Sequence, residues 1–127
     1  MAIRTELSLR LQNSPGALGG VCRALSDEHV NVLAVSLEAS GQLRLVVDNH
    51  VHAAAVLRER HHKLTERSVV VLAVSNTPGA LANTLKLVAD AGINIDYVYG
   101  GTAEGGRSAS VVLGVEDAMR ASAAAGV

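Results

Sequence analysis

The sequence predicts an α+β protein built from two ferredoxin-like domains, because it contains one pattern twice. Asn13-Ser14-Pro15-Gly16-Ala17-Leu18 returns as Asn76-Thr77-Pro78-Gly79-Ala80-Leu81, and Val30-Asn31-Val32 returns as Ile93-Asn94-Ile95. Both pairs of asparagines are 63 positions apart. Since the offset is constant, the segment between the two motifs has the same length in each half. The repeat is therefore a duplicated structural unit.

The first half opens with a strand and a helix. Leu7, Leu9 and Leu11 alternate with polar residues, which is the period of a strand with one buried face. Ser14 and Pro15 are typical of a helix start. The helix that follows has an apolar stripe made of Leu18, Val21, Cys22 and Leu25. Because Cys22 aligns with Leu85 in the second half, we expect a packed core thiol rather than a nucleophile or metal ligand.

The remainder of the first half predicts a hairpin, a helix and a last strand. Residues 32–37 and 43–47 are rich in β-branched and leucine residues around a turn at Ser40-Gly41. Asp48 or Asn49 caps the next helix, and residues 63–67 form the closing strand. The order is βαββαβ, the ferredoxin-like plan, over residues 1–66.

The second half, residues 67–127, repeats this plan less completely. Its first strand and helix carry apolar residues at the repeated positions, which are Val70, Leu72, Val74, Leu81, Leu85 and Val88. The closing helix, residues 116–124, offers only alanines, Ser122 and Met119 for packing, and we expect this domain to lack its last strand. Val69, Val71 and Ala73 add a second apolar face to the first strand, which predicts an interface with another copy of the chain.

Composition excludes several classes of function. The formal net charge is -1, charged residues make up 18% of the chain and no basic run occurs, so neither nucleic acid nor an anionic membrane is an expected partner. With only two tyrosines and no Phe or Trp, the chain lacks an RNA-stacking surface. No apolar stretch reaches the roughly 18 residues of a membrane span. A single cysteine and no apolar leader predict a cytoplasmic protein.

No catalytic or metal-binding signature is present in the sequence. We find no nucleophile elbow, no phosphate loop and no repeated pair of carboxylates, so we expect no enzyme and no cofactor. The paired histidines at 50 and 52 and at 61 and 62 lie at opposite ends of a predicted helix, which does not suit a metal site. The glycine-rich run at 100–106 lies between two strands and predicts a hairpin loop.

The doubled turn and the doubled asparagine are the candidate binding elements. Pro-Gly at a helix start lets a molecule approach the unpaired N–H groups of the first turn, which favour a carboxylate. An asparagine side chain both donates and accepts hydrogen bonds, which suits an ammonium beside a carboxylate. These features suit a zwitterionic ligand that carries both groups. The alternative is that the residues only form turns and helix starts.

At these motifs the chain resembles the ACT domain family, the ligand-sensing modules of amino-acid metabolism, in two copies over nearly its whole length. The resemblance implies two domains side by side in one extended, eight-stranded antiparallel sheet, with helices on one face and the second strands joined. It also implies an amino acid held between the first turn of one domain and the second strand of the other.

Transferred to this chain, the resemblance implies two unequal sites. The first joins Asn13, Ser14, Pro15, Gly16, Ala17 and Leu18 to Asn94, Ile95 and Asp96. The second joins Asn76, Thr77, Pro78, Gly79, Ala80 and Leu81 to Asn31, Val32 and Leu33. Some ACT sensors carry a histidine two residues before the turn asparagine. Here Leu11 and Val74 stand at those positions, so the resemblance assigns no particular amino acid.

The predicted function is regulatory, with no reaction of its own. Binding of an amino acid would be reported to a partner enzyme or through a homodimer. Two alternatives stay open: a detached regulatory subunit of an acetolactate synthase or aspartokinase, and an assembly module without a ligand. An acylphosphatase-like enzyme using Arg10 and Asn13 is a third, weaker interpretation.

Overall fold

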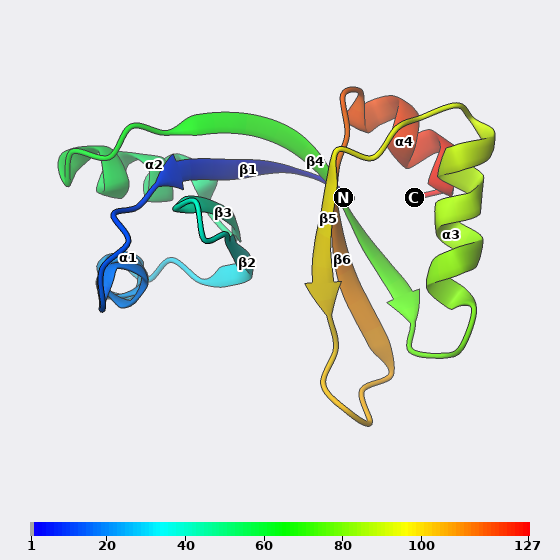
Figure 1. Ribbon diagram of the computed structural model, residues 1–127, viewed down its shortest axis with the longest axis horizontal. Coiled ribbons are helices and arrows are strands. Elements are labelled where there is room, and N and C mark those ends of the chain that lie inside the picture. The colour runs from blue at the N-terminus through cyan, green and yellow to red at the C-terminus, as the bar shows by residue number, and fades with distance from the viewer. Residues whose placement is uncertain (1) are drawn as a thin grey trace. The chain divides into compact units, whose positions relative to one another are not determined.

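The computed structural model describes residues 2–127 (Figure 1). Over these residues the protein is α+β, with four helices and a six-stranded antiparallel sheet of strand order β2-β3-β1-β4-β6-β5. In chain order the elements are β1 (Ile3–Arg10), α1 (Ala17–Asp27), β2 (Val32–Leu37), β3 (Gln42–Val47), α2 (His50–Glu59), β4 (Thr65–Ser75), α3 (Ala80–Asp90), β5 (Tyr97–Gly101), β6 (Ser108–Gly114) and α4 (Ala118–Ala125).

The chain divides into two compact units. The first unit is Thr5–Arg67, and the second unit is Ser68–Val127 together with the described residues before Thr5. In the first unit β3 pairs antiparallel with both β1 and β2, from Glu6↔Val46 to Arg10↔Gln42 on one side. In the second unit β6 pairs antiparallel with β4 and β5 in the same way. Each unit thus repeats the predicted order of elements.

Residues 2–4 lie beside β4, where a fourth strand of the second unit would lie. The N–H of Val71 donates to the carbonyl of Ala2 at 2.6 Å, and Ala2 and Ile3 pack against the core of this unit. After α4 the described chain adds no strand. The start of the chain therefore provides a backbone hydrogen bond to β4 of the second unit.

The expected eight-stranded sheet, joined through the second strands of the domains, is not confirmed. The sheet has six strands over residues 2–127, and the second strands of the two units, β2 and β5, are the first and last in the strand order. β4 has 11 residues and runs across the boundary between the two units.

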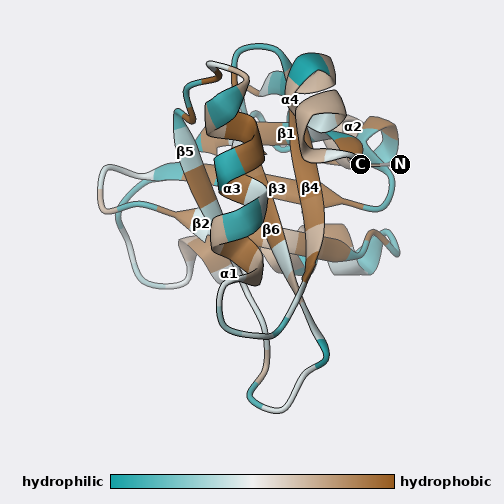
Figure 2. Ribbon diagram, turned by 90° about the vertical axis from the view of Figure 1, so that its right-hand side faces the viewer, coloured by the Kyte–Doolittle hydropathy of each residue, from teal (hydrophilic) through white to brown (hydrophobic). Residues whose placement is uncertain are grey.

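Each unit has its own hydrophobic core, with both helices on one face of its strands. In the first unit the inward leucines of β1 and β3 pack against Leu25 of α1 and Leu57 of α2. In the second unit Leu72 and Leu113 pack against Val88 of α3 and the alanines of α4. In Figure 2, β4 is coloured mostly as hydrophobic, whereas α3 has both hydrophilic and hydrophobic segments.

Three predicted details differ from the structure. Cys22 is only partly buried and lies outside the first core. Val69 is fully buried within this chain while Ala73 is exposed, so Val69 cannot belong to a surface that covers a second copy. Ser14 does not cap α1, because Gly16 adopts a left-handed φ of 84° and delays the helix to Ala17.

No helix among residues 2–127 has the length and apolar character needed to cross a membrane.

Candidate ligand-binding turns

Both Asn-x-Pro-Gly turns place a glycine in the left-handed conformation directly before a helix. The φ angles are 84° at Gly16 and 86° at Gly79, and neither α1 nor α3 has a side-chain cap. A non-glycine residue is strained at such φ values, which explains the glycine in both copies. The first N–H groups of each helix lack intrahelical acceptors, and the helix dipole makes this end attractive to a carboxylate.

The turn of the second unit lies beside a cavity of about 410 Å³. We call it the second turn pocket. Its walls come from the end of β4, the start of α3, β5, the following loop and β6, and its lining residues are Val74, Ser75, Asn76, Thr77, Leu81, Val98, Tyr99, Gly100, Gly101, Thr102, Ala109 and Val111. The Asn76 amide nitrogen donates to the carbonyl of Gly106 at 2.7 Å, which fixes the side chain against the β5–β6 loop.

The turn of the first unit lies beside a smaller cavity of about 140 Å³. This first turn pocket is lined by Leu11, Gln12, Asn13, Ser14, Gly16, Ala17, Leu18, Gly19, Leu37, Glu38, Ala39 and Gly41. On the other side of the same turn, a cavity of about 540 Å³ brings Arg10, Arg60 and His62 near the start of α1. The surroundings of the first turn are thus more basic than those of the second.

The second asparagine of each repeat lies away from the turn of its own unit. β1 and β2 both pair antiparallel with β3 and therefore run in the same direction. Asn13 follows the end of β1, whereas Asn31 precedes the start of β2, so the two lie at opposite ends of the strands. The same holds for Asn76 and Asn94. The predicted sites pair a turn with the asparagine of the other domain, and that pairing stays a prediction.

Asn31 and Asn94 have different surroundings. The backbone N–H of Asn31 donates to Asp48 Oδ1 at 3.0 Å, Val32 packs against the first core, and Leu33 is 47% exposed. Asn94 and Asp96 line a polar cavity of about 420 Å³ with Glu116, Asp117 and Arg120, while Ile95 packs against the second core. The Arg120 guanidinium donates to the carbonyl of Ala91.

Four of the predicted turn residues line neither turn pocket. Pro15, Pro78, Gly79 and Ala80 shape their turns without lining either turn pocket, whereas Thr77 and Leu81 line the second. Sequence reasoning missed Val98 and Tyr99 of β5 and Ala109 of β6, and it treated Gly100 only as part of a hairpin loop. The repeat offset could have revealed one of them, since Gly100 replaces Leu37 at the equivalent position.

The side chains at these sites are mostly uncharged. Among residues 2–127, no three His, Cys, Asp or Glu side chains group as metal ligands. The second turn pocket contains no charged side chain among its lining residues. Its polar groups are hydroxyls, one amide and backbone N–H and C=O groups, which hold a ligand by hydrogen bonds.

Several solved structures are similar to this chain. Protein BT0572 from Bacteroides thetaiotaomicron has a TM-score of 0.87 and 27% sequence identity, over 97% of this chain and 86% of that one. The ligand-free regulatory subunit of aspartate kinase from Thermus thermophilus has a TM-score of 0.73 at 21% identity, over 99% and 91% of the two chains.

A third similar structure is E. coli aspartokinase III in complex with lysine and aspartate, with a TM-score of 0.62 at 17% identity, over 94% of this chain and 29% of that one. At such identities the two kinase structures show a common fold. No curated protein matches the chain in sequence. The family model of the ACT domain pair matches residues 1–123, and the chain therefore belongs to the ACT domain pair family.

Proposed function

We propose that this protein is a regulatory, non-catalytic amino-acid sensor that binds a free amino acid at its Asn-x-Pro-Gly turns. The observation that carries the proposal is the second turn pocket, where an uncapped helix start, Asn76 and an uncharged cavity of about 410 Å³ meet. The similarity to the regulatory subunit of an aspartate kinase supports a regulatory role.

The turn contains groups for both ends of a zwitterion. The N–H groups at the start of α3 suit the carboxylate. Asn76 uses its amide nitrogen on the carbonyl of Gly106, which leaves its Oδ1 as an acceptor for the ammonium. The hydroxyls of Ser75 and Thr77, which line the same cavity, add further acceptors.

The second half of each site is proposed to come from the other domain. Asn94 and Asp96 would complete the site at the first turn, and Asn31 would complete the site at the second. Asn94 Nδ2 lies 3.3 Å from Asp96 Oδ1, so the two side chains form one polar group. A carboxylate at Asp96 would favour the ligand ammonium, and for this reason we expect the two sites to differ in affinity.

Homodimer formation is also proposed, through β2 and β5, the first and last strands in the strand order. Leu33, Val35 and Leu37 on β2 are 47%, 48% and 45% exposed, and Val98 on β5 is 51% exposed. An apolar strand with unpaired backbone groups is a template for pairing with another chain. Light scattering should give twice the chain mass, and Val35→Lys should shift the equilibrium to monomer. A monomeric mass for the unaltered chain at micromolar concentration would remove this part of the proposal.

The test of sensing is calorimetric titration of the full chain with the common amino acids. At least one should bind with measurable heat. Asn76→Ala and Asn31→Ala should weaken one site, and Asn13→Ala and Asn94→Ala should weaken the other. Absence of binding across the whole panel would overturn sensing, and equal weakening of both sites by each variant would overturn the pairing between domains.

A detached regulatory subunit of aspartokinase type is the second candidate function. It is favoured by the Thermus thermophilus regulatory subunit, 91% of whose chain this chain covers. In that case the tagged protein should retain a catalytic chain during purification. Separately, the single, partly buried Cys22 fits a location in a reducing cytoplasm. Purification of the chain alone from its native cells would argue for the free sensor.

A further inference from the structure

We infer that the second turn pocket selects an amino acid with an uncharged aliphatic side chain, and that the first turn pocket does not share this site. The inference rests on the proposed function and names the ligand class of one of its turns. It follows from a comparison of the two turn pockets, which differ in volume and in the chemistry of their lining residues.

The size difference is accompanied by a difference in one row of residues across the strands. In the first unit the row is Leu9, Leu43 and Leu37, paired side by side across β1, β3 and β2. In the second unit the equivalent row is Leu72, Val111 and Gly100 across β4, β6 and β5. The edge position thus carries a leucine in one unit and no side chain in the other.

The two cavities differ as this row predicts. Leu37 lines the first turn pocket of about 140 Å³, and Gly100 lines the second of about 410 Å³. Pockets that hold small molecules span roughly 300–1,000 Å³. The second turn pocket falls within that range and the first falls below it. Of the two turn pockets, only the second therefore has room for a large side chain of a ligand within its own unit.

The walls of the second turn pocket define the class of side chain. Leu81, Val98, Ala109 and Val111 are aliphatic, and no Asp, Glu, Lys or Arg is among the lining residues. A charged ligand side chain placed there would lose its hydration without gaining a partner, which is unfavourable. An aliphatic side chain would instead cover Leu81 and Val98, which are 39% and 51% exposed.

Calorimetric titration of the full chain tests the inference. Leucine, isoleucine, valine and methionine are compared with lysine, aspartate and glutamate. We expect at least one aliphatic ligand to bind at one site per chain, and about tenfold or weaker binding of every charged ligand, a difference of about 1.4 kcal/mol. A charged amino acid as the tightest ligand would overturn this inference and leave the proposed function standing. Silence from all amino acids would overturn both.

Substitutions locate the site. Ala109→Leu should fill the cavity and abolish aliphatic binding. Ala109 is partly buried against the core, so Val98→Asp at a half-exposed position provides a second variant. It should weaken binding by roughly tenfold or more, because it places a charge against an aliphatic ligand.

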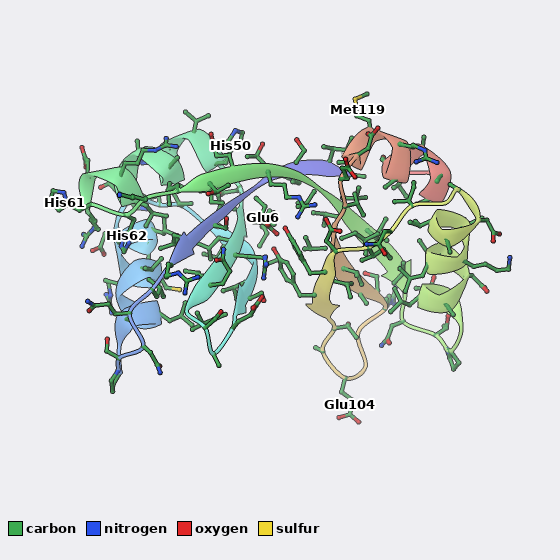
Figure 3. The ribbon with its side chains drawn as sticks, turned by 45° about the horizontal axis from the view of Figure 1, so that its top comes forward. Glu6, His50, His61, His62, Glu104 and Met119 are labelled. Atoms are coloured by element: carbon green, nitrogen blue, oxygen red, sulfur yellow. The ribbon has the colours of Figure 1, made fainter. Side chains whose placement is uncertain are left out.

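The matched control for Val98→Asp is Met119→Asp. Met119 is 75% exposed on α4 of the same unit, and Figure 3 shows it projecting away from the β5–β6 hairpin whose tip carries Glu104. Met119→Asp should leave affinity unchanged, with circular dichroism confirming that each variant is folded. Equal loss of binding in the two aspartate variants, or unchanged binding in folded Ala109→Leu, would overturn the inference.

Discussion

The second helices of the two units, α2 and α4, have the same place in the fold but contribute unequally to it. α2 buries Val56 and Leu57 beside two alanines, whereas α4 buries only Ala118, Ala121 and Ser122. The second core is completed instead by residues outside the repeat, including Ala2 and Ile3 from the start of the chain. The duplicated copies have therefore diverged: the first retains larger core side chains, and the second retains the larger turn pocket.

The largest expected effect tests the contribution of α2 against that of α4. Leu57→Ala removes a fully buried side chain and should lower the free energy of unfolding by about 2–5 kcal/mol. Ala121→Gly at a fully buried position of α4 should cost only about 0.5–1 kcal/mol, through helix entropy. Urea denaturation of both variants measures the difference, and equal losses would contradict the comparison of the two cores.

Removal of residues 1–4 should damage one unit only. The deletion removes the hydrogen bond between Val71 and Ala2 and the packing of Ile3, and we expect a loss of roughly 2–3 kcal/mol. Amide hydrogen exchange should accelerate in β4 and β6 of the second unit. Protection of α1 and α2 should be retained. Uniform acceleration through the whole chain would show that the two units unfold as one.

Gly100 on β5 of the second unit should be less tolerant of substitution than the equivalent Leu37 on β2 of the first unit. A Cβ at Gly100 would lie 2.2 Å from the carbonyl oxygen of Ser110 and 2.8 Å from the Cα of Val111, both backbone atoms. Gly100→Ala should therefore cost about 1–3 kcal/mol by overpacking.

The matched change in the first unit is Leu37→Ala. This leucine is 45% exposed, so its truncation should cost less than about 1 kcal/mol. Thermal melts monitored by circular dichroism distinguish the two changes. A larger loss at Leu37 than at Gly100 would mean that the two edge strands do not differ in the way described.

The smallest expected effect concerns the turn asparagines without ligand. Asn76→Ala loses the 2.7 Å hydrogen bond to Gly106 and should lower stability by about 0.5–1.5 kcal/mol. Asn13→Ala should change stability by less than about 0.5 kcal/mol, as is usual for exposed surface positions. Chemical denaturation in ligand-free buffer separates the two, and equal effects would show that the loop contact does not stabilise the turn.

Local patterns of the sequence predicted much of the fold. The leucine alternation of β1, the helix stripe and the cap at Asn49, whose side chain accepts from the His52 N–H at 3.1 Å, depend on neighbours close in sequence. The offset also aligned His29 with Gly92, and both adopt positive φ at the end of a helix. The ACT family followed from the same motifs, because the turn and its glycine are local features.

Features that depend on distant contacts were not predicted. Nothing in the first four residues indicates that Ala2 will pair with Val71, because their hydrogen bond joins segments far apart in the chain. The cavity at the second turn depends on Gly100, Ala109 and the β5–β6 loop, none of which belongs to the repeated motif. Helix starts were placed too early for a local reason, since the left-handed glycine follows the proline and delays the first turn.

The continuity of β4 determines how this protein can be dissected. The boundary between the units falls between Arg67 and Ser68, inside a strand of 11 residues, so no interdomain linker is available for cleavage. Expression of two halves cut at that point would sever a strand and separate the second unit from residues 2–4. A circular permutant that begins at Ser68 and joins Val127 to Ala2 through a flexible linker would cut β4 at the same point but would keep residues 2–4 contiguous with the second unit.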